Sequence, residues 1–161
     1  MNAFILTGGQ SRRFGSDKSL AQINGVSFAE HLYKRLTKKF ARVAIIGKEE
    51  KHTDLPFISD AIAVQCPLVG IYSGLLSSDS DWNFFVGVDL PLVDISLITL
   101  LENYLSDTYQ IVLPEADGKW HPLCAFYHRS LIPAIKAALD GGNYRLMDLI
   151  RPARHLMVDA G

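Results

Sequence analysis

The chain has 161 residues, of which 48% are hydrophobic and 20% charged, and this composition predicts one soluble globular domain with a substantial core. The formal net charge of -1 gives no general attraction for nucleic acid or for an anionic membrane surface. No apolar run approaches the roughly 20 residues of a membrane span, and the first residues lack the basic start of a signal peptide, so we expect a cytoplasmic protein that binds neither nucleic acid nor membrane.

The first predicted element is a buried strand that leads into a phosphate-binding loop. Residues 3–6 are apolar without alternation, which is typical of a strand covered on both faces of a parallel sheet. Gly8 and Gly9 follow directly, and paired glycines let a ligand approach backbone N–H groups without a Cβ in the way. Cations follow in the same loop, among them Arg13 and Lys18, and a polyphosphate offers many oxygens for such groups to bind.

This loop differs from the two better-known phosphate loops. Its glycines do not have the spacing G-x-G-x-x-G of a dinucleotide site, and Ser16 and Asp17 separate Gly15 from Lys18, which excludes a P-loop. The pattern is G-G-x-S-x-R-x-G-x-D-K instead. An ordinary turn with solvated arginines is the alternative at this point, because loops of glycine and mixed charge are common.

Strands and helices alternate along the remaining chain. Further strands are predicted at 43–46, 55–59, 82–88, 110–113 and 155–158, with an apolar segment at 123–127, and helices at 27–39, 67–77, 95–104, 130–140 and 145–150. Such alternation predicts a Rossmann-like α/β fold of three layers, in which helices cover both faces of a mostly parallel sheet.

Glycines or a carboxylate directly follow three of the predicted strands. Gly8 and Gly9 follow the first strand, Asp60 follows the strand at 55–59, and Asp89 follows the most apolar one. In parallel sheets ligands bind at the carboxyl ends of the strands, so we expect these residues along one edge. A cationic glycine-rich loop opposite a carboxylate suits a nucleoside triphosphate with Mg²⁺, because Mg²⁺ takes one or two carboxylates plus phosphate oxygens and water.

Several separated motifs resemble those of a known family, the molybdenum cofactor guanylyltransferases. The segments that carry the resemblance, in the family's order, are LTGGxSxRxGxDK at 6–18, PLVGI at 67–71, VDLP at 88–91, HPL at 121–123 and GGNYRLMDL at 141–149. The match covers nearly the whole chain. It implies transfer of GMP from Mg-GTP to the phosphate of molybdopterin, with release of pyrophosphate.

The resemblance also assigns roles to individual residues. The matched positions are Leu6, Thr7, Gly8, Gly9, Lys18, Asp60 and Asp89 for the nucleotide, Asp89 for Mg²⁺, and Lys18, Asp89 and Arg13 for catalysis. The implied partners are GTP, molybdopterin or the molybdenum cofactor, and proteins that deliver or accept the cofactor.

One nucleotidyltransferase domain is expected over residues 1–161, with a nucleotide-binding part at about 1–95 and an acceptor-binding part at about 96–161 that includes His121 and Arg145. The family usually continues past this point with an Asn-x-Asn-Thr-Pro segment. We therefore expect a shortened C-terminus, near-normal GTP binding and weak GMP transfer.

Four positions depart from the family pattern, Thr7, Phe14, Cys66 and Ile46, and two alternatives to the guanylyltransferase reading remain. Thr7 replaces a usual Ala, and Ile46 stands where the family often has an Asn that touches the nucleotide. The nearest alternative keeps the fold and changes the substrates, as in a cytidylyl- or uridylyltransferase acting on another phosphorylated acceptor. An alternative of another class is a non-catalytic nucleotide-binding accessory protein. The presence of both Lys18 and Asp89 argues against this alternative.

Overall fold

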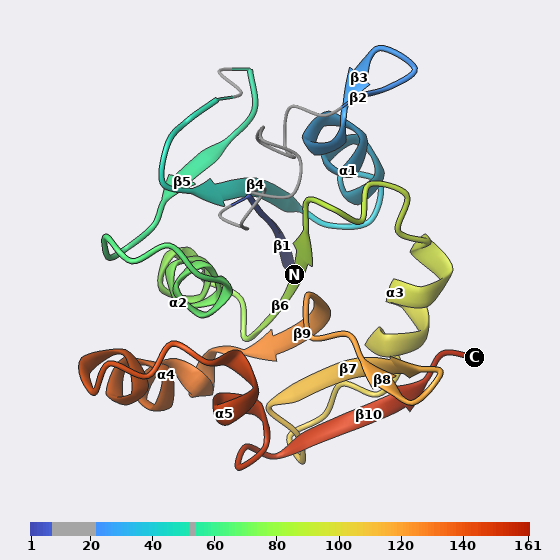
Figure 1. Cartoon of the computed structure of the whole chain (residues 1–161). Coiled ribbons are helices and arrows are strands. Elements are labelled where there is room, and N and C mark those ends of the chain that lie inside the picture. Colours follow the sequence, from blue (N-terminus) through green and yellow to red (C-terminus); the bar gives the residue numbers. More distant parts are fainter. Residues whose placement is uncertain (8–21, 52–53) are drawn as a thin grey trace.

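The computed structural model describes residues 1–7, 22–51 and 54–161, so the predicted loop at 8–18 lies outside the described residues. Within them, an eight-stranded sheet forms the middle of the molecule (Figure 1). Its strands are β1 (Asn2–Leu6), β4 (Arg42–Gly47), β5 (Phe57–Ser59), β6 (Trp82–Gly87), β7 (Ile111–Ala116), β8 (Lys119–Trp120), β9 (Cys124–His128) and β10 (His155–Asp159). A separate hairpin consists of β2 (Gln22–Ile23) and β3 (Val26–Ser27).

The order of the main strands is β10-β7-β9-β6-β1-β4-β5, with β8 paired to β7. β1 pairs in parallel with β4 and β6, β4 pairs in parallel with β5, and β10 pairs in parallel with β7. Only β8 and β9 run antiparallel to their neighbours in the sheet as described. The prediction of a mostly parallel α/β sheet is confirmed.

Helices cover both faces of this sheet. They are α1 (Phe28–Leu36), α2 (Pro67–Ser77), α3 (Ile95–Glu102), α4 (Ile132–Asp140) and α5 (Leu146–Ile150), with a 3₁₀ turn, η2 (Arg129–Leu131), before α4. α1 and α3 contribute to one buried apolar core, and α2, α4 and α5 contribute to the other, on the opposite face (Figure 1). The predicted three layers are therefore present. No helix in the described parts of the chain is long and apolar enough to cross a membrane.

The first helix begins as predicted and ends early. Ser27 Oγ accepts a hydrogen bond from Glu30 N at 3.2 Å, which is one half of a capping box. The helix was predicted to reach residue 39, and this bound is wrong. Thr37 Oγ1 donates to Lys34 O at 3.0 Å, and the chain then turns so that Phe40 packs into the core.

Two glycines allow α2 to lie very close to the sheet. An added Cβ on Gly70 would stand 2.7 Å from Leu6 Cδ2, and one on Gly74 would stand 2.5 Å from Phe85 Cε1. These distances are too short for real carbon atoms, so the helix contacts β1 and β6 through its glycine face. Gly70 and Gly74 are four residues apart in the sequence, a spacing that places both on this face of the helix.

Gly74→Ala should lower the free energy of unfolding by about 1–3 kcal/mol, because the added methyl group has no space against Phe85. The loss should appear although alanine is the better helix former by about 1 kcal/mol. Urea unfolding measures it. Gly141→Ala is the matched control, since the nearest atom to its added Cβ is Ala137 O at 3.4 Å. Equal stabilities for the two variants would contradict the close packing.

Candidate active site

The ends of β1 and β6 bring Leu6 and Asp89 to one edge of the sheet. Leu6 lies opposite Gly87 in parallel register, and Val88 N donates to Leu6 O at 3.0 Å. Asp89 follows at once, with an exposed side chain. This is the edge at which we expected the ligand. Gly8, Gly9, Arg13 and Lys18 would continue from it, but they lie outside the described residues, and their roles stay predictions.

Thr7 is anchored to the neighbouring strand at this edge. Thr7 N and Thr7 Oγ1 both donate to Ile46 O, at 3.0 and 2.8 Å. The hydroxyl occupies the space beside Gly47 in which a side chain at residue 47 would otherwise lie. The Ile46 side chain is buried, with 1% of its surface exposed, so it offers no contact to a ligand at the edge. Thr7 is the polar side chain at this point.

Asp60 lies at the same edge, after β5. Asp60 N donates to Gly47 O at 2.9 Å, which holds the end of β5 beside that of β4. The side chain is half-buried, and this burial raises the pKa of Asp60 above its ordinary value. A partly desolvated carboxylate gains most from a ligand that brings hydrogen-bond donors.

The Asp89 carboxylate has no hydrogen bond or ion pair with another residue in the described parts of the chain. Carboxylate oxygen suits a hard cation such as Mg²⁺. The described residues contain no group of three or more His, Cys, Asp or Glu side chains that could hold a metal alone. Phosphate oxygens of a bound nucleotide and water would suit the remaining positions around a metal at Asp89, and this carboxylate fits such a site.

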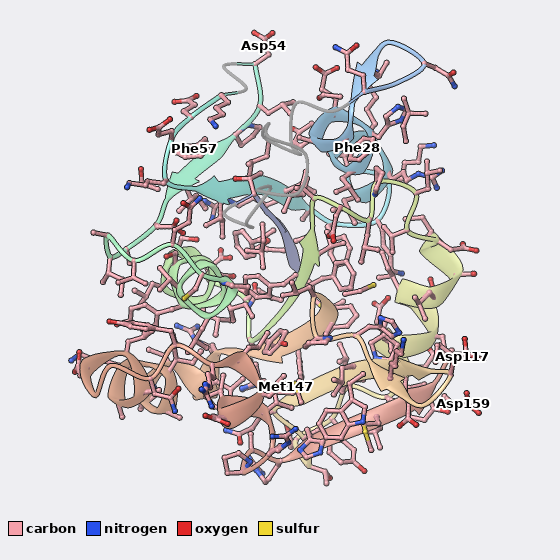
Figure 2. The ribbon with its side chains drawn as sticks, viewed as in Figure 1. Phe28, Asp54, Phe57, Asp117, Met147 and Asp159 are labelled. Carbon is pink, nitrogen blue, oxygen red and sulfur yellow. The ribbon has the colours of Figure 1, made fainter. Side chains whose placement is uncertain are left out.

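A large cavity of about 740 Å³ opens beside Asp89. It lies between the segment after β6, helix α3 and the ends of β7 and β10. Most of its lining is apolar and includes Leu90, Leu97, Leu100, Pro114, Ala116 and Ala160. The ends of β7 and β10 lie together here, and the labels of Asp117 and Asp159 mark this end of the sheet in Figure 2.

The residues predicted for the acceptor side do not all meet in this cavity. His121 lines it, and His121 N donates to Pro114 O at 3.0 Å. Arg145 does not line it, because it precedes α5, which packs on the opposite face of the sheet from α3. Cys124 also lines the cavity; burial raises the pKa of its thiol to about 12, so the thiol is protonated at neutral pH.

A smaller and mostly polar cavity of about 230 Å³ lies on the other side of Asp89 in the strand order. Its lining residues are Thr7, Lys48, Glu49, Lys51 and Gln65. The edge thus carries a polar cavity beside β1 and β4 and an apolar cavity beside β6 and β7, with Asp89 between them. The sequence analysis predicted neither cavity, although the run of apolar residues directly after Asp89 was an available signal for the larger one.

Comparison with known proteins shows that the chain is a nucleotidyltransferase. Residues 3–157 match the family described as "MobA-like NTP transferase domain", and the chain belongs to this family. The family relationship predicted from the motifs is confirmed.

Its relatives carry a consistent description. A probable molybdenum cofactor guanylyltransferase of Flavobacterium johnsoniae is 28% identical, over 99% of this chain and 85% of the relative. One of Bacillus cereus is 32% identical, over 91% of this chain and 77% of the relative.

Solved structures agree on the fold. Molybdopterin-guanine dinucleotide biosynthesis protein A from Archaeoglobus fulgidus superposes with a TM-score of 0.85 at 19% identity, over 99% of this chain and 83% of that one. The bifunctional IspDF from Campylobacter jejuni gives 0.75 at 15% identity, over 99% and 49%. At such identities these structures show the fold alone.

Proposed function

We propose that this protein transfers GMP from GTP to the phosphate of molybdopterin and releases pyrophosphate. The observation that carries the proposal is the position of Asp89, an unpaired carboxylate among the described residues, between a polar and a mostly apolar cavity at the carboxyl edge of the sheet. Two substrates that meet at a metal-binding carboxylate need this arrangement. The names of the relatives support the choice of nucleotide and acceptor.

The nucleotide would lie along the ends of β1, β4 and β5. Leu6 and Thr7 lead into the loop at 8–18, whose backbone N–H groups, with Lys18, would bind the triphosphate. Asp60 accepts hydrogen bonds only, and guanine offers two adjacent donors on its Watson–Crick edge. Asp89 would hold Mg²⁺, which when bound neutralises phosphate charge.

The transfer step demands positioning more than acid–base chemistry. An oxygen of the molybdopterin phosphate forms a bond to the α-phosphorus of GTP, and the bond from that phosphorus to pyrophosphate breaks with its electron pair. The attacking phosphate monoester needs little help from a base. Lys18 and Arg13 would stabilise the charge on the transferring group and on the leaving pyrophosphate.

The acceptor would occupy the cavity of about 740 Å³. Its apolar walls suit the flat ring system of a pterin, and His121 offers a polar group at the lining. In this assignment a single domain spans residues 1–161, and the part from about 96 onward contributes most of the acceptor side. We place the reaction in the cytoplasm, where other proteins would deliver molybdopterin or accept the finished cofactor.

A panel of nucleotides with Mg²⁺ tests the nucleotide assignment. GTP at about 100 times its Kd should stabilise the protein by about 2.7 kcal/mol, which a thermal shift measures readily. ATP, CTP and UTP at the same concentration should stabilise it less. A larger shift with CTP would favour the cytidylyltransferase alternative.

Asp60→Asn should lower the preference for GTP over ATP and CTP. The amide is close in shape to the carboxylate, yet it replaces one acceptor oxygen by a donor that would face the donors of guanine. Competition binding with the three nucleotides measures the preference. An equal loss of affinity for all three would indicate contact with the ribose or a purely structural role.

The same variant carries a pH signature. Because burial raises the pKa of Asp60, the neutral acid stabilises the folded protein at low pH, and this contribution is lost as the pH rises through the raised value. At neutral pH the charged Asp60 is therefore unfavourable without nucleotide. Asp60→Asn should make the nucleotide-free protein more stable at pH 7 than the unmodified chain, and the difference should shrink as the pH falls.

A further inference from the structure

The Asp89 carboxylate lies directly against the backbone of Gly87, the last residue of β6. A Cβ added to Gly87 would stand 2.8 Å from Asp89 Oδ1 and 3.9 Å from Asp89 Cγ. The first distance is shorter than a carbon and an oxygen tolerate without moving apart. The carboxylate thus fills the space that any side chain at residue 87 would need.

The other surroundings of Gly87 would accept a methyl group. Its φ lies outside the left-handed region, so an alanine adopts the same backbone without strain. The next nearest atom to the added Cβ is Leu123 Cβ at 3.7 Å, an ordinary contact. Gly87 N donates to Leu123 O at 2.9 Å, and Gly87 O accepts from Leu90 N at 3.1 Å, and neither bond depends on a missing side chain.

We propose that Gly87 is a positioning residue for Asp89, and this rests on the proposed role of Asp89 in holding the metal of the nucleotide. The bare backbone at residue 87 sets where the carboxylate oxygens lie. An alanine there pushes the end of the Asp89 side chain away, because that end is the movable partner of the collision. A displacement of about 1 Å at a reacting group can cost on the order of a hundredfold in rate.

Gly87→Ala should therefore weaken metal binding without changing the stability of the fold. We expect an unchanged unfolding midpoint and unchanged binding of GTP in the presence of a chelator. The Mg²⁺ concentration that gives half-maximal tightening of GTP binding, measured by calorimetric titration, should rise about tenfold, and transfer should fall by about ten- to a hundredfold. Gly141→Ala is the matched control and should leave every one of these quantities unchanged.

A double-mutant cycle with Asp89→Ala decides whether the effect passes through the carboxylate. Asp89→Ala alone should raise the Mg²⁺ requirement, and adding Gly87→Ala to it should have no further effect. An equal loss from Gly87→Ala in both backgrounds would overturn the proposal, as would an unchanged Mg²⁺ requirement in the single Gly87→Ala variant.

The cycle also distinguishes this inference from the function on which it rests. If Asp89→Ala leaves the Mg²⁺ requirement unchanged, the proposed metal role of Asp89 fails. If Asp89→Ala raises it and Gly87→Ala does not, only the positioning role fails. If Gly87→Ala lowers the stability of the protein, the double variant should regain that stability, because it lacks the Asp89 carboxylate with which the new methyl group collides. A double variant as unstable as Gly87→Ala alone would overturn the proposal.

Discussion

Asp89→Asn should leave the protein folded and lower Mg²⁺-dependent nucleotide transfer by at least about a hundredfold, the range seen when a group that stabilises transition-state charge is removed. The amide keeps the shape of the side chain and loses the negative charge that attracts a cation. Asp89 is exposed and has no partner among the described residues, so none of the contacts that hold the described elements together uses its charge. Transfer kinetics and urea unfolding of the same preparation check both halves of this expectation.

Asp140→Asn is the control for the loss of a single carboxylate. Asp140 forms an exposed ion pair with Lys136 on α4, with a distance of 2.7 Å, and belongs to neither cavity. Such surface pairs contribute only about 0–1 kcal/mol, so this variant should keep its activity and nearly all of its stability. Undiminished transfer by Asp89→Asn would exclude the metal role of that residue.

Phe85→Ala should lower the free energy of unfolding by about 3–5 kcal/mol, the usual cost of removing a fully buried aromatic ring. Phe85 is completely buried in β6, stacks on Phe4 with ring centroids 5.2 Å apart, and meets Tyr127 edge-on at 5.7 Å. Gly74 of α2 packs on the same ring, so the cavity left behind would lie between helix and sheet. Urea unfolding gives the value.

Phe28→Ala provides the comparison for Phe85→Ala. Phe28 begins α1 and is only partly buried, and Figure 2 shows it in the first turn of that helix. Its removal should cost about 1–2 kcal/mol, because less apolar surface is taken from the interior. Equal losses for the two variants would mean that the packing beneath α2 contributes less than the structure indicates.

The elements that sequence reasoning located well are those with strong local signals. Helix α2 has its predicted bounds, since Pro67 favours the first turn of a helix and its apolar and glycine positions repeat at helical spacing. The strands β1, β4 and β6 are unbroken apolar runs that only a sheet covered on both faces accommodates.

The elements that were missed or misjudged depend on partners far away in sequence. The strand predicted at 110–113 extends to Ala116 through Pro114, because at Pro114 the pairing with β9 has ended and only β10 is paired there. The hairpin of β2 and β3 was not predicted. Its turn consists of Asn24 and Gly25, which have φ of 53° and 80°, and an Asn-Gly pair is the usual sequence signal of such a tight turn.

The candidate site shows the same difference between features with a local sequence signal and features that depend on distant partners. The position of Asp60 and Asp89 at one edge of the sheet was predicted because polar residues at strand ends face the ligand edge in any parallel sheet, and their roles stay predictions. The large cavity was not foreseen, since it requires β10 to return beside β7, and the contact between Gly87 and the Asp89 carboxylate exists only in three dimensions. The motif of Arg145 says nothing about which face α5 covers, so the sequence could not indicate that this residue lies away from the large cavity.

The central claim is guanylyl transfer, and one measurement tests it most directly. The protein is incubated with Mg²⁺, molybdopterin and GTP labelled at the α-phosphate, and the label is followed into the dinucleotide product together with the release of pyrophosphate. The account predicts label transfer and pyrophosphate in equal amounts from GTP, and little of either from labelled CTP, UTP or ATP. Transfer from another nucleotide at an equal or greater rate, or no transfer from any of them, would contradict it.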